Sequence, residues 1–569
     1  MRRTLGVGRS LRRDRAAGRG RPRRRPRGPY RAAEPGRPGR PARAGTDRRK
    51  PRRAAGVARR LARRGRYGRL PPRPHPPHGG TARRDPRRRT RPARPWPLPR
   101  HPHRPHPARP PRPGPPRQPL RRTDGGRAVS ASTPAARKQV HLAAHFPGVN
   151  STTVWRDPGS RSQIDFASFQ HLARTAERGR FDFFFLAEGL RLRERKGRIH
   201  DLDVVGRPES LTVLNALAAV TEHLGLAATV NATFNEPYEL ARRFATLDHL
   251  SGGRAAWNIV TSSDAFTGEN FRRGGYLDRT DRYTRAAEFV EVARALWDSW
   301  PSGGTPRTVR HSGPQFDITA RATLPHSPQV HPVLIQAGDS DEGREFAART
   351  ADIVFSRHGT LEAGRAFHAD VKGRLARYGR TPDQLKILPA ATVVLGDSEA
   401  DAQERAAHIR RQQVSPQTAI ATLENVWGRD LTGYDPDGPL PDVEPVPDGE
   451  LAQGWAHMAD RFGIAARWRD LAEEKHLSIR ELAIELTARQ SFIGTPGSVA
   501  AAMDEHVQTD AADGFILVPH LTPGGLDEFV DRVVPLLQER GVLRTEYQGR
   551  TLRDHLGLGR PAPRQEEPA

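Results

Sequence analysis

Cysteine is absent from the 569-residue sequence. This absence excludes disulfide bonds, thiolate metal sites and a cysteine nucleophile. Long apolar runs are missing as well, and no apolar stretch follows the arginines near the N-terminus. The sequence therefore predicts neither a membrane span nor a secretory signal, and we expect a cytoplasmic protein.

Acidic residues are scarce in the first quarter of the chain. Residues 1–130 hold 43 Lys or Arg against 5 Asp or Glu, so this part carries a net charge of +38, the remainder −8 and the whole chain +30. Arg, Pro, Gly and Ala dominate there, and large apolar residues are few. Because such a composition cannot offset the entropy of ordering, residues 1–137 are predicted to be a disordered, basic, Arg/Pro-rich segment.

Two interpretations of this basic segment stay open. Arginine clusters neutralise phosphates, which favours a tail that binds nucleic acid or another anionic surface. However, only Tyr30, Tyr67 and Trp96 are available to stack on bases. We favour the second interpretation, an inert tail or upstream sequence included by a start site assigned too early, and then expect no nucleic-acid partner.

Residues 138–558 alternate short apolar runs with stretches of helical periodicity. The run at 181–187 is typical of a strand buried on both faces, and the stretch at 166–179 is typical of a helix that ends at a glycine. Strands alternating with helices predict parallel βαβ units, and eight strands favour an α/β fold closed into a TIM (β/α)8 barrel over an open sheet. No G-x-G-x-x-G motif follows the first strand, which counts against a dinucleotide-binding fold. The predicted strands are 140–146, 181–187, 226–231, 255–260, 331–337, 352–356, 387–395 and 514–519.

Three stretches interrupt the alternation. Residues 264–281 and 301–330 are rich in Gly, Pro and polar residues, and residues 400–489 are predicted to be an insertion with helices at both ends. The loops that follow the strands build the active site of a TIM barrel, so we expect insertions there to shape or cover the pocket. Residues 559–569 are expected to form a flexible tail.

A set of short motifs runs in a fixed order through residues 139–558. The motifs are WRDP (155–158), FDFFFLAEG (181–189), GLAATV (225–230), SGGRAAWNIVTS (251–262), DRY (281–283), QAGDSDEG (336–343), GTP (494–496), DGF (513–515) and RDHLG (553–557). Each is unspecific alone. As an ordered set they resemble the bacterial-luciferase-like flavin monooxygenases, in the group of nitrilotriacetate monooxygenase and dibenzothiophene-sulfone monooxygenase.

This resemblance implies a fold, a cofactor and a partner. It implies a TIM-barrel enzyme that takes reduced FMN as a diffusible co-substrate from a separate NAD(P)H:flavin reductase. It also implies that a flavin hydroperoxide formed with O₂ inserts one oxygen atom into a small substrate at carbon, nitrogen or sulfur. We further expect a homo-oligomer, while the substrate depends on pocket loops that the fold does not determine.

The turn at 338–340 lies between a predicted strand and a helix that runs to residue 349. Backbone N–H groups at a helix N-terminus favour an anion, although Asp and Ser are also common there as plain caps. The resemblance implies that Gly338 and Ser340 receive the FMN phosphate and that Tyr283 contacts it. Arg279 stands where the family often has histidine, and its guanidinium could pair with the phosphate.

Polar residues end several predicted strands, at the face where a TIM barrel keeps its active site. Asn258 and Thr261 end the strand at 255–260, either as site residues or as strand-end caps. The resemblance implies that Glu188, where the family has Asp, and Thr229 contact the flavin. For Thr229, β-propensity is an alternative explanation.

Candidate catalytic residues lie after two of the strands. His145 and Asn150 follow the first strand, where the resemblance implies pocket histidines, and His358 follows the strand at 352–356. A lone histidine is more often structural, so both explanations stay open. No spacing of acidic residues and histidines matches a metal site, and we predict none.

Two other functions remain open from the sequence. One is a luciferase-like oxidoreductase that uses a deazaflavin for hydride transfer without O₂. The other is a non-catalytic protein that binds flavin, or that acts through its basic segment, without turnover.

Overall fold

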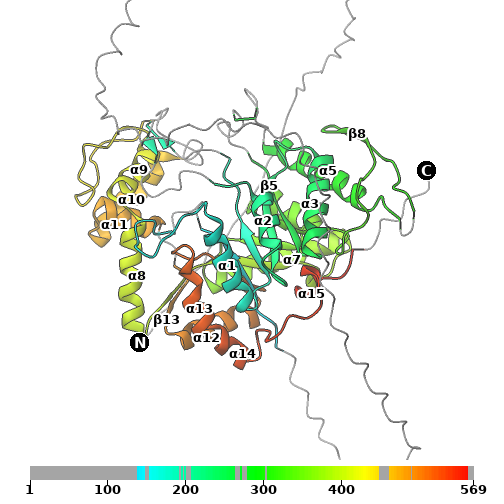
Figure 1. Ribbon diagram of the computed structural model, residues 1–569. Helices are drawn as coiled ribbons and strands as arrows, with labels where there is room; N and C mark the ends of the chain where they lie inside the picture. The colour runs from blue at the N-terminus through cyan, green and yellow to red at the C-terminus, as the bar shows by residue number, and fades with distance from the viewer. Residues whose placement is uncertain are drawn as a thin grey trace, which may run out of the picture. The chain divides into compact units, whose positions relative to one another are not determined.

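Eight parallel strands close into a barrel in the computed structural model of the protein (Figure 1). The structure describes residues 137–147, 153–190, 194–196, 198–199, 207–262, 270–271, 279–301, 304–446, 460–487 and 490–561. The predicted TIM barrel is confirmed. In their order around the barrel, the strands are β1 (His141–His145), β2 (Phe183–Leu186), β5 (Gly225–Asn231), β6 (Ala255–Val260), β9 (Val333–Gln336), β10 (Ile353–Ser356), β11 (Lys386–Ala391) and β14 (Gly514–Leu517).

The strands are apolar on both faces because each separates two cores. In β2, Phe183 and Phe185 belong to the cluster inside the barrel, while Phe184 and Leu186 belong to the cluster under the surrounding helices. All four side chains are buried. Because both faces of the strand are buried, its sequence is a continuous apolar run.

Helices cover the outside of the barrel. Residues 527–539 form two short helices, α13 and α14, and Pro535, which has no backbone N–H, stands in the first turn of α14. The covering helices are α1 (Phe166–Arg178), α2 (Ser210–Ala218), α3 (Pro237–Ser251), α5 (Arg279–Trp297), α6 (Asp341–Thr350), α7 (Leu361–Arg374), α12 (Pro496–Gln508), α13 (Asp527–Arg532) and α14 (Val534–Glu539).

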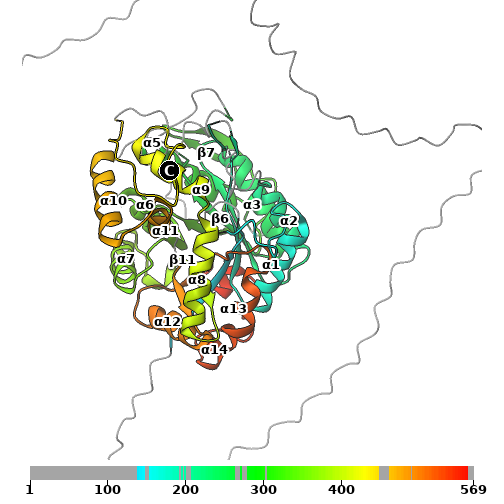
Figure 2. The same ribbon diagram turned by 90° about the vertical axis from the view of Figure 1, so that its left-hand side faces the viewer.

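The predicted strand at 387–395 is two strands. β11 stays in the barrel, whereas β12 (Val393–Leu395) leaves it and pairs in parallel with β13 (Phe492–Gly494). The insertion lies between these two short strands, on one flank of the barrel (Figures 1 and 2). As expected, helices occupy both of its ends, and they have a core of their own around Trp427. They are α8 (Glu399–Gln413), α9 (Pro416–Trp427), α10 (Arg461–Lys475) and α11 (Ile479–Thr487).

Residues 301–330 follow a helix rather than a strand. They contain the antiparallel hairpin of β7 (Val309–Ser312) and β8 (Asp317–Ala320), which packs on α5. The Glu288 carboxylate of α5 accepts hydrogen bonds from the backbone N–H groups of Gln315 and Phe316 at 3.0 and 2.8 Å. This stretch is therefore not one of the loops at the carboxyl ends of the strands. A second hairpin, β3 (Glu194–Arg195) with β4 (Arg198–Ile199), does follow a strand, β2.

The C-terminal segment closes the amino end of the barrel. Leu552, Leu556 and Leu558, in and after α15 (Leu552–His555), pack against the interior residues of the strands. The Leu552 N–H donates to the Gly253 carbonyl at 2.9 Å, just before β6. The carboxyl ends of the strands are therefore the accessible face of the barrel.

The basic segment, except for Arg137, and most of the predicted tail lie outside the described residues. Within the described part of the chain, none of the helices combines the length and apolar character needed to cross a membrane. The same part holds no group of three or more His, Asp or Glu residues arranged to bind a metal ion.

Candidate active site at the carboxyl ends of the strands

Asn258 of β6 and Thr229 of β5 form a buried polar pair near the carboxyl ends of their strands. The two residues are register partners, and the Asn258 Nδ2 donates to the Thr229 Oγ1 at 3.0 Å. The Asn258 Oδ1 is buried and has no hydrogen-bond partner in the described structure. A buried amide oxygen without a hydrogen bond lowers the stability of the folded protein. This atom is therefore a candidate acceptor for a hydrogen-bond donor of a ligand.

Glu188 lies two residues after β2, and the last residue of β5 contacts it. The Asn231 Nδ2 donates to the Glu188 Oε2 at 3.1 Å, and Asn231 itself is fully buried. Burial raises the pKa of Glu188 to about 7. This carboxyl group can therefore carry a proton near neutral pH. Asn231 was not predicted, although it ends an apolar strand in the same way as Asn258.

His145 ends β1 inside the barrel mouth. Its ring stacks on Phe185 with 5.4 Å between centroids, and its Nδ1 has no hydrogen-bond partner in the described structure. Burial and the nearby Arg207 guanidinium lower its pKa to about 3, so the imidazole is neutral at pH 7. Arg207 donates to the Ala187 carbonyl at 3.0 Å, directly after β2. A neutral ring with an unpaired nitrogen can bind a ligand or move a proton.

The turn after β9 brings the predicted phosphate residues together. Ser340 caps α6, and its Oγ accepts from the Gly343 N–H at 3.2 Å. The Tyr283 hydroxyl of α5 lies against the same turn: a Cβ on Gly338 would be 2.8 Å from it, and a Cβ on Gly343 would be 2.9 Å from it. The structure thus forms a close cradle of glycine backbone, one hydroxyl and a helix N-terminus, a chemistry that suits a phosphate group.

His358 contacts this cradle through a residue that was not predicted. Its Nε2 lies 3.5 Å from the Asp339 Oδ1, and its ring packs on Phe367. The Arg344 guanidinium donates to the same Asp339 oxygen at 3.3 Å. His358 is therefore placed beside the turn at 338–340.

Three other predicted residues are less defined. The Thr261 carbonyl accepts from the Arg282 guanidinium at 2.8 Å, which ties the end of β6 to the first turn of α5. Arg279 is the first residue of α5, but its side chain lies outside the described part of the structure. Asn150 lies outside the described residues altogether.

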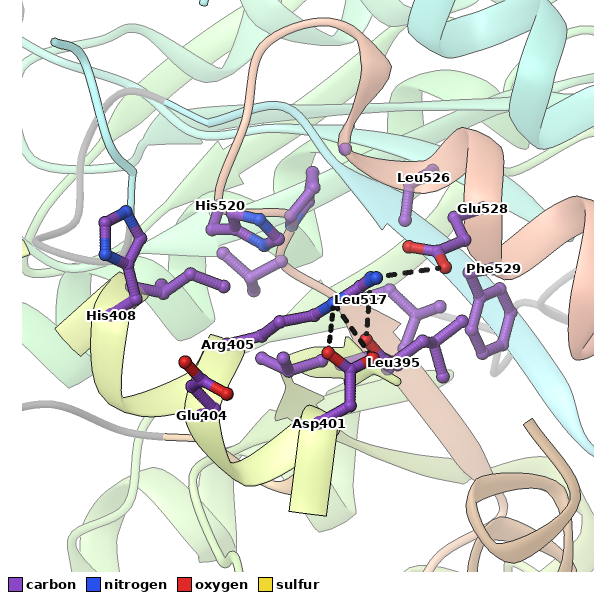
Figure 3. Close-up of a pocket in the computed structure, with 16 residues that line it drawn as sticks. Leu395, Asp401, Glu404, Arg405, His408, Leu517, His520, Leu526, Glu528 and Phe529 are labelled. Carbon is purple, nitrogen blue, oxygen red and sulfur yellow. Dashed lines mark hydrogen bonds and ion pairs between the residues drawn. The ribbon is translucent and has the colours of Figure 1, made fainter. Parts of the chain in front are cut away.

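A separate pocket of about 430 Å³ lies on the outside of the barrel wall, between α8, β12 and the end of β14 (Figure 3). Its wall includes Leu517, which belongs to the core outside the barrel. Arg405 crosses it and pairs with Asp401 at 3.2 Å and with Glu528 at 3.8 Å. Since none of the predicted site residues lines this pocket, we take the barrel mouth as the candidate active site.

Comparison with known proteins shows the family of the chain. A family model described as luciferase-like monooxygenase matches residues 146–514. The chain is 39% identical to nitrilotriacetate monooxygenase component A of Aminobacter aminovorans, covering 75% of this chain and 98% of the relative. It is also 39% identical to dibenzothiophene-sulfone monooxygenase of Rhodococcus erythropolis (strain XP), covering 74% and 98%. A structure of riboflavin lyase with modified FMN and riboflavin matches with a TM-score of 0.61 at 29% identity, over 74% of this chain and 96% of that one.

Proposed function

Since the chain belongs to the luciferase-like monooxygenase family, we propose that it is a two-component, FMN-dependent monooxygenase. It takes reduced FMN from a separate NAD(P)H:flavin reductase and uses O₂ to transfer one oxygen atom to a small organic substrate. The atom that receives the oxygen is a carbon, a nitrogen or a sulfur. The relatives support this proposal, because the riboflavin lyase structure contains a modified FMN.

One observation carries the proposal. A helix N-terminus with a tyrosine hydroxyl beside it and buried polar atoms without partners in the described structure lie at the same end of the barrel. The cradle joins Gly338, Ser340 and Tyr283, and the unpaired atoms are the Asn258 Oδ1 and the His145 Nδ1. A phosphorylated, planar ligand with hydrogen-bonding edges would complement both, and FMN is such a ligand.

The residues of the mouth have separate tasks in this proposal. The phosphate is held by Gly338, Ser340, Tyr283 and Arg279. The flavin ring is contacted by Glu188, Thr229, Asn258 and Thr261. Bound reduced FMN supplies the electrons that activate O₂, and the protein supplies position and exclusion of water.

His145, His358 and Asn150 are proposed to act on the substrate side. The His145 ring is neutral and buried, so it can orient a substrate or accept a proton from it. His358 lies next to Asp339, and its ring packs on Phe367. Residues 138–558 form the catalytic unit of the proposed homo-oligomer, with residues 400–489 as its helical insertion.

The test couples the purified full-length protein to a generic flavin reductase. O₂ consumption and oxygenated products are measured while sulfur compounds, amines and aminopolycarboxylates are supplied. We expect substrate-dependent consumption of O₂, with one oxygen atom from ¹⁸O₂ found in the product by mass spectrometry. The proposal fails if calorimetry detects binding of neither oxidised nor reduced FMN.

The two alternative functions give different results in the same assay. A deazaflavin enzyme would transfer hydride without consuming O₂, and a non-catalytic protein would bind FMN without any turnover. Removal of residues 1–130 separates a role of the basic segment from that of the barrel, since only the former would be lost.

A further inference from the structure

We propose that Glu188 exchanges a proton with solvent when flavin binds: its carboxyl becomes protonated in the complex and donates a hydrogen bond to the flavin. The inference rests on the proposed FMN site. It adds a property of this chain, proton uptake coupled to cofactor binding, that an uncharged or permanently ionised residue would not give.

The first argument is the direction of the Asn231 amide. The Asn231 Oδ1 accepts from the Phe234 N–H at 2.7 Å, so the amide cannot turn round without losing this bond. Its Nδ2 is therefore the atom that faces the Glu188 Oε2, at 3.1 Å. The Asn231 contacts by themselves lower the pKa of Glu188, but burial outweighs them, and the oxygen that does not accept from the Nδ2 can carry a proton and donate it.

The second argument is the missing cation. Within the described structure no Lys or Arg forms an ion pair with Glu188, and the charge that acts on its pKa, that of Glu209, is a like charge. Arg207 is directed to the Ala187 carbonyl and acts on His145, which is itself neutral. Burial without a compensating cation favours the protonated form, in agreement with a pKa raised to about 7.

Asp182, at the other end of β2, shows what a cation changes. This carboxylate is fully buried, which by itself would raise its pKa. However, the Arg544 guanidinium donates to it at 2.6 Å and His141 lies 3.2 Å away, so its pKa is held at about 2. The two carboxyl groups near the two ends of one strand thus have pKa values shifted in opposite directions, because only Asp182 has a cation beside it.

Flavin binding is expected to raise the pKa of Glu188 further. A ligand in the barrel mouth excludes more water from the carboxyl group, and reduced flavin adds negative charge. The exclusion of water acts with oxidised and reduced flavin alike and is enough to disfavour the carboxylate, so one proton is taken from solvent; the charge of reduced flavin adds to this effect. The neutral carboxyl group can then donate to a carbonyl or nitrogen acceptor of the flavin, which a carboxylate cannot do.

The test is isothermal titration calorimetry of oxidised FMN into the full-length protein at pH 8, in HEPES and in Tris. The difference between the heats in the two buffers gives the protons exchanged. With a free pKa of about 7, the wild type should take up about 0.9 proton per FMN. Riboflavin, which lacks the phosphate, should give the same number and so exclude the phosphate as the source.

Glu188→Gln mimics the protonated carboxyl group and should bind FMN with no proton uptake. Glu539→Gln, on exposed surface of α14, is the matched control and should behave as the wild type. Equal heats in both buffers for the wild type, or unchanged uptake in Glu188→Gln, would overturn the inference while leaving FMN binding intact. If FMN does not bind to the wild type, the proposed function itself fails.

A second measurement needs no variant. Uptake of one proton means that the affinity of the wild type for FMN falls about tenfold from pH 8 to pH 9. An affinity that stays constant over this range contradicts the inference even if Glu188→Gln does not fold.

Discussion

Buried polar groups at the two ends of the barrel differ in how many of their hydrogen bonds are formed within the protein. At the amino end, the Arg553 guanidinium lies 2.9 Å from the Asp352 carboxylate, and Arg254 donates five hydrogen bonds to Ser251, Thr221 and neighbouring carbonyls. At the carboxyl end, the Asn258 Oδ1 and the His145 Nδ1 have no hydrogen-bond partner in the described structure. The comparison teaches that one end is built for stability and the other keeps its polar groups for a ligand.

The amino end also holds unpaired buried polar atoms in the described structure, among them the Arg544 Nη1 and the Asp298 Oδ2, and His555 is a further example. His555 is buried at the amino end, and neither ring nitrogen has a hydrogen-bond partner in the described structure. Burial lowers its pKa to about 4, and its ring packs on Tyr547 with 4.9 Å between centroids. His555 therefore acts as a neutral aromatic side chain within the seal of the barrel.

The largest effect on stability is expected from removing an ion pair at the amino end of the barrel. Arg553→Met removes the ion-pair partner of the largely buried Asp352 carboxylate, which then keeps only the weaker effects of Arg294 and Arg380. Losing one partner of a buried pair costs about 3–5 kcal/mol, so the midpoint of urea unfolding should fall strongly. Arg532→Met removes exposed ion pairs with Glu528 and Asp397 and should change the midpoint of urea unfolding little, since solvent screens such pairs. Equal losses in the two variants would refute the contrast.

The next prediction concerns the pH dependence of folding. A carboxyl group whose pKa is raised on folding stabilises the protein while it is protonated. For Glu188 this contribution is present below pH 4.5 and is lost as the pH rises through about 7. Glu188→Gln keeps the neutral form, so it should be about 2 kcal/mol more stable than the wild type at pH 8. The difference should vanish below pH 4.5 in urea titrations at each pH.

Folding shifts the pKa of Asp182, which directly precedes β2, in the direction opposite to that of Glu188. Its pKa is lowered on folding from 3.8 to about 2, so its stabilising contribution is present above pH 3.8 and is lost as the pH falls through about 2. If Glu188→Gln changed stability equally at pH 4 and pH 8, Glu188 would not differ from an ordinary surface carboxyl group.

A smaller effect is expected in the phosphate cradle. A Cβ on Gly338 would lie 2.5 Å from the Gln336 Nε2 and 2.8 Å from the Tyr283 hydroxyl, so Gly338→Ala must displace both. We expect FMN affinity to fall at least tenfold, about 1.4 kcal/mol, with a smaller loss for riboflavin, which has no phosphate. Gly373→Ala has open space around its Cβ and is the matched control. Equal losses for FMN and riboflavin would contradict a phosphate site.

Sequence patterns predicted the elements where burial alone determines them. The predicted strand at 255–260 has the same bounds as β6. A glycine turn precedes this mostly apolar run and polar residues follow it, so both of its ends can be located from the sequence. The strand at 387–395 was wrong in its second half, since β12 leaves the barrel for a partner, β13, that lies about a hundred residues later. Local periodicity holds no information on such a distant pairing.

The site was predictable only in part, for the same reason. Asn231 could have been found by the strand-end argument that selected Asn258. The contacts of Tyr283 with the turn at 338–340, and of His358 with Asp339, join residues from separate loops. Only the family resemblance pointed to Tyr283, and no local signal pointed to Asp339.

The smallest effect separates orientation from binding at the carboxyl end. Thr229→Val keeps the shape of the side chain but removes the acceptor of the Asn258 amide, so the unpaired Oδ1 loses its fixed direction. We expect a loss of about 1 kcal/mol in stability and a reduction of FMN affinity by about threefold. Thr246→Val, on the exposed face of α3, removes a hydroxyl bonded to the Arg242 carbonyl and should leave FMN binding unchanged. Calorimetry of FMN binding to both variants tests this prediction. If the two variants bind FMN with the same affinity, the Asn258 oxygen does not contact the ligand. The unpaired groups of the carboxyl end would then need another explanation.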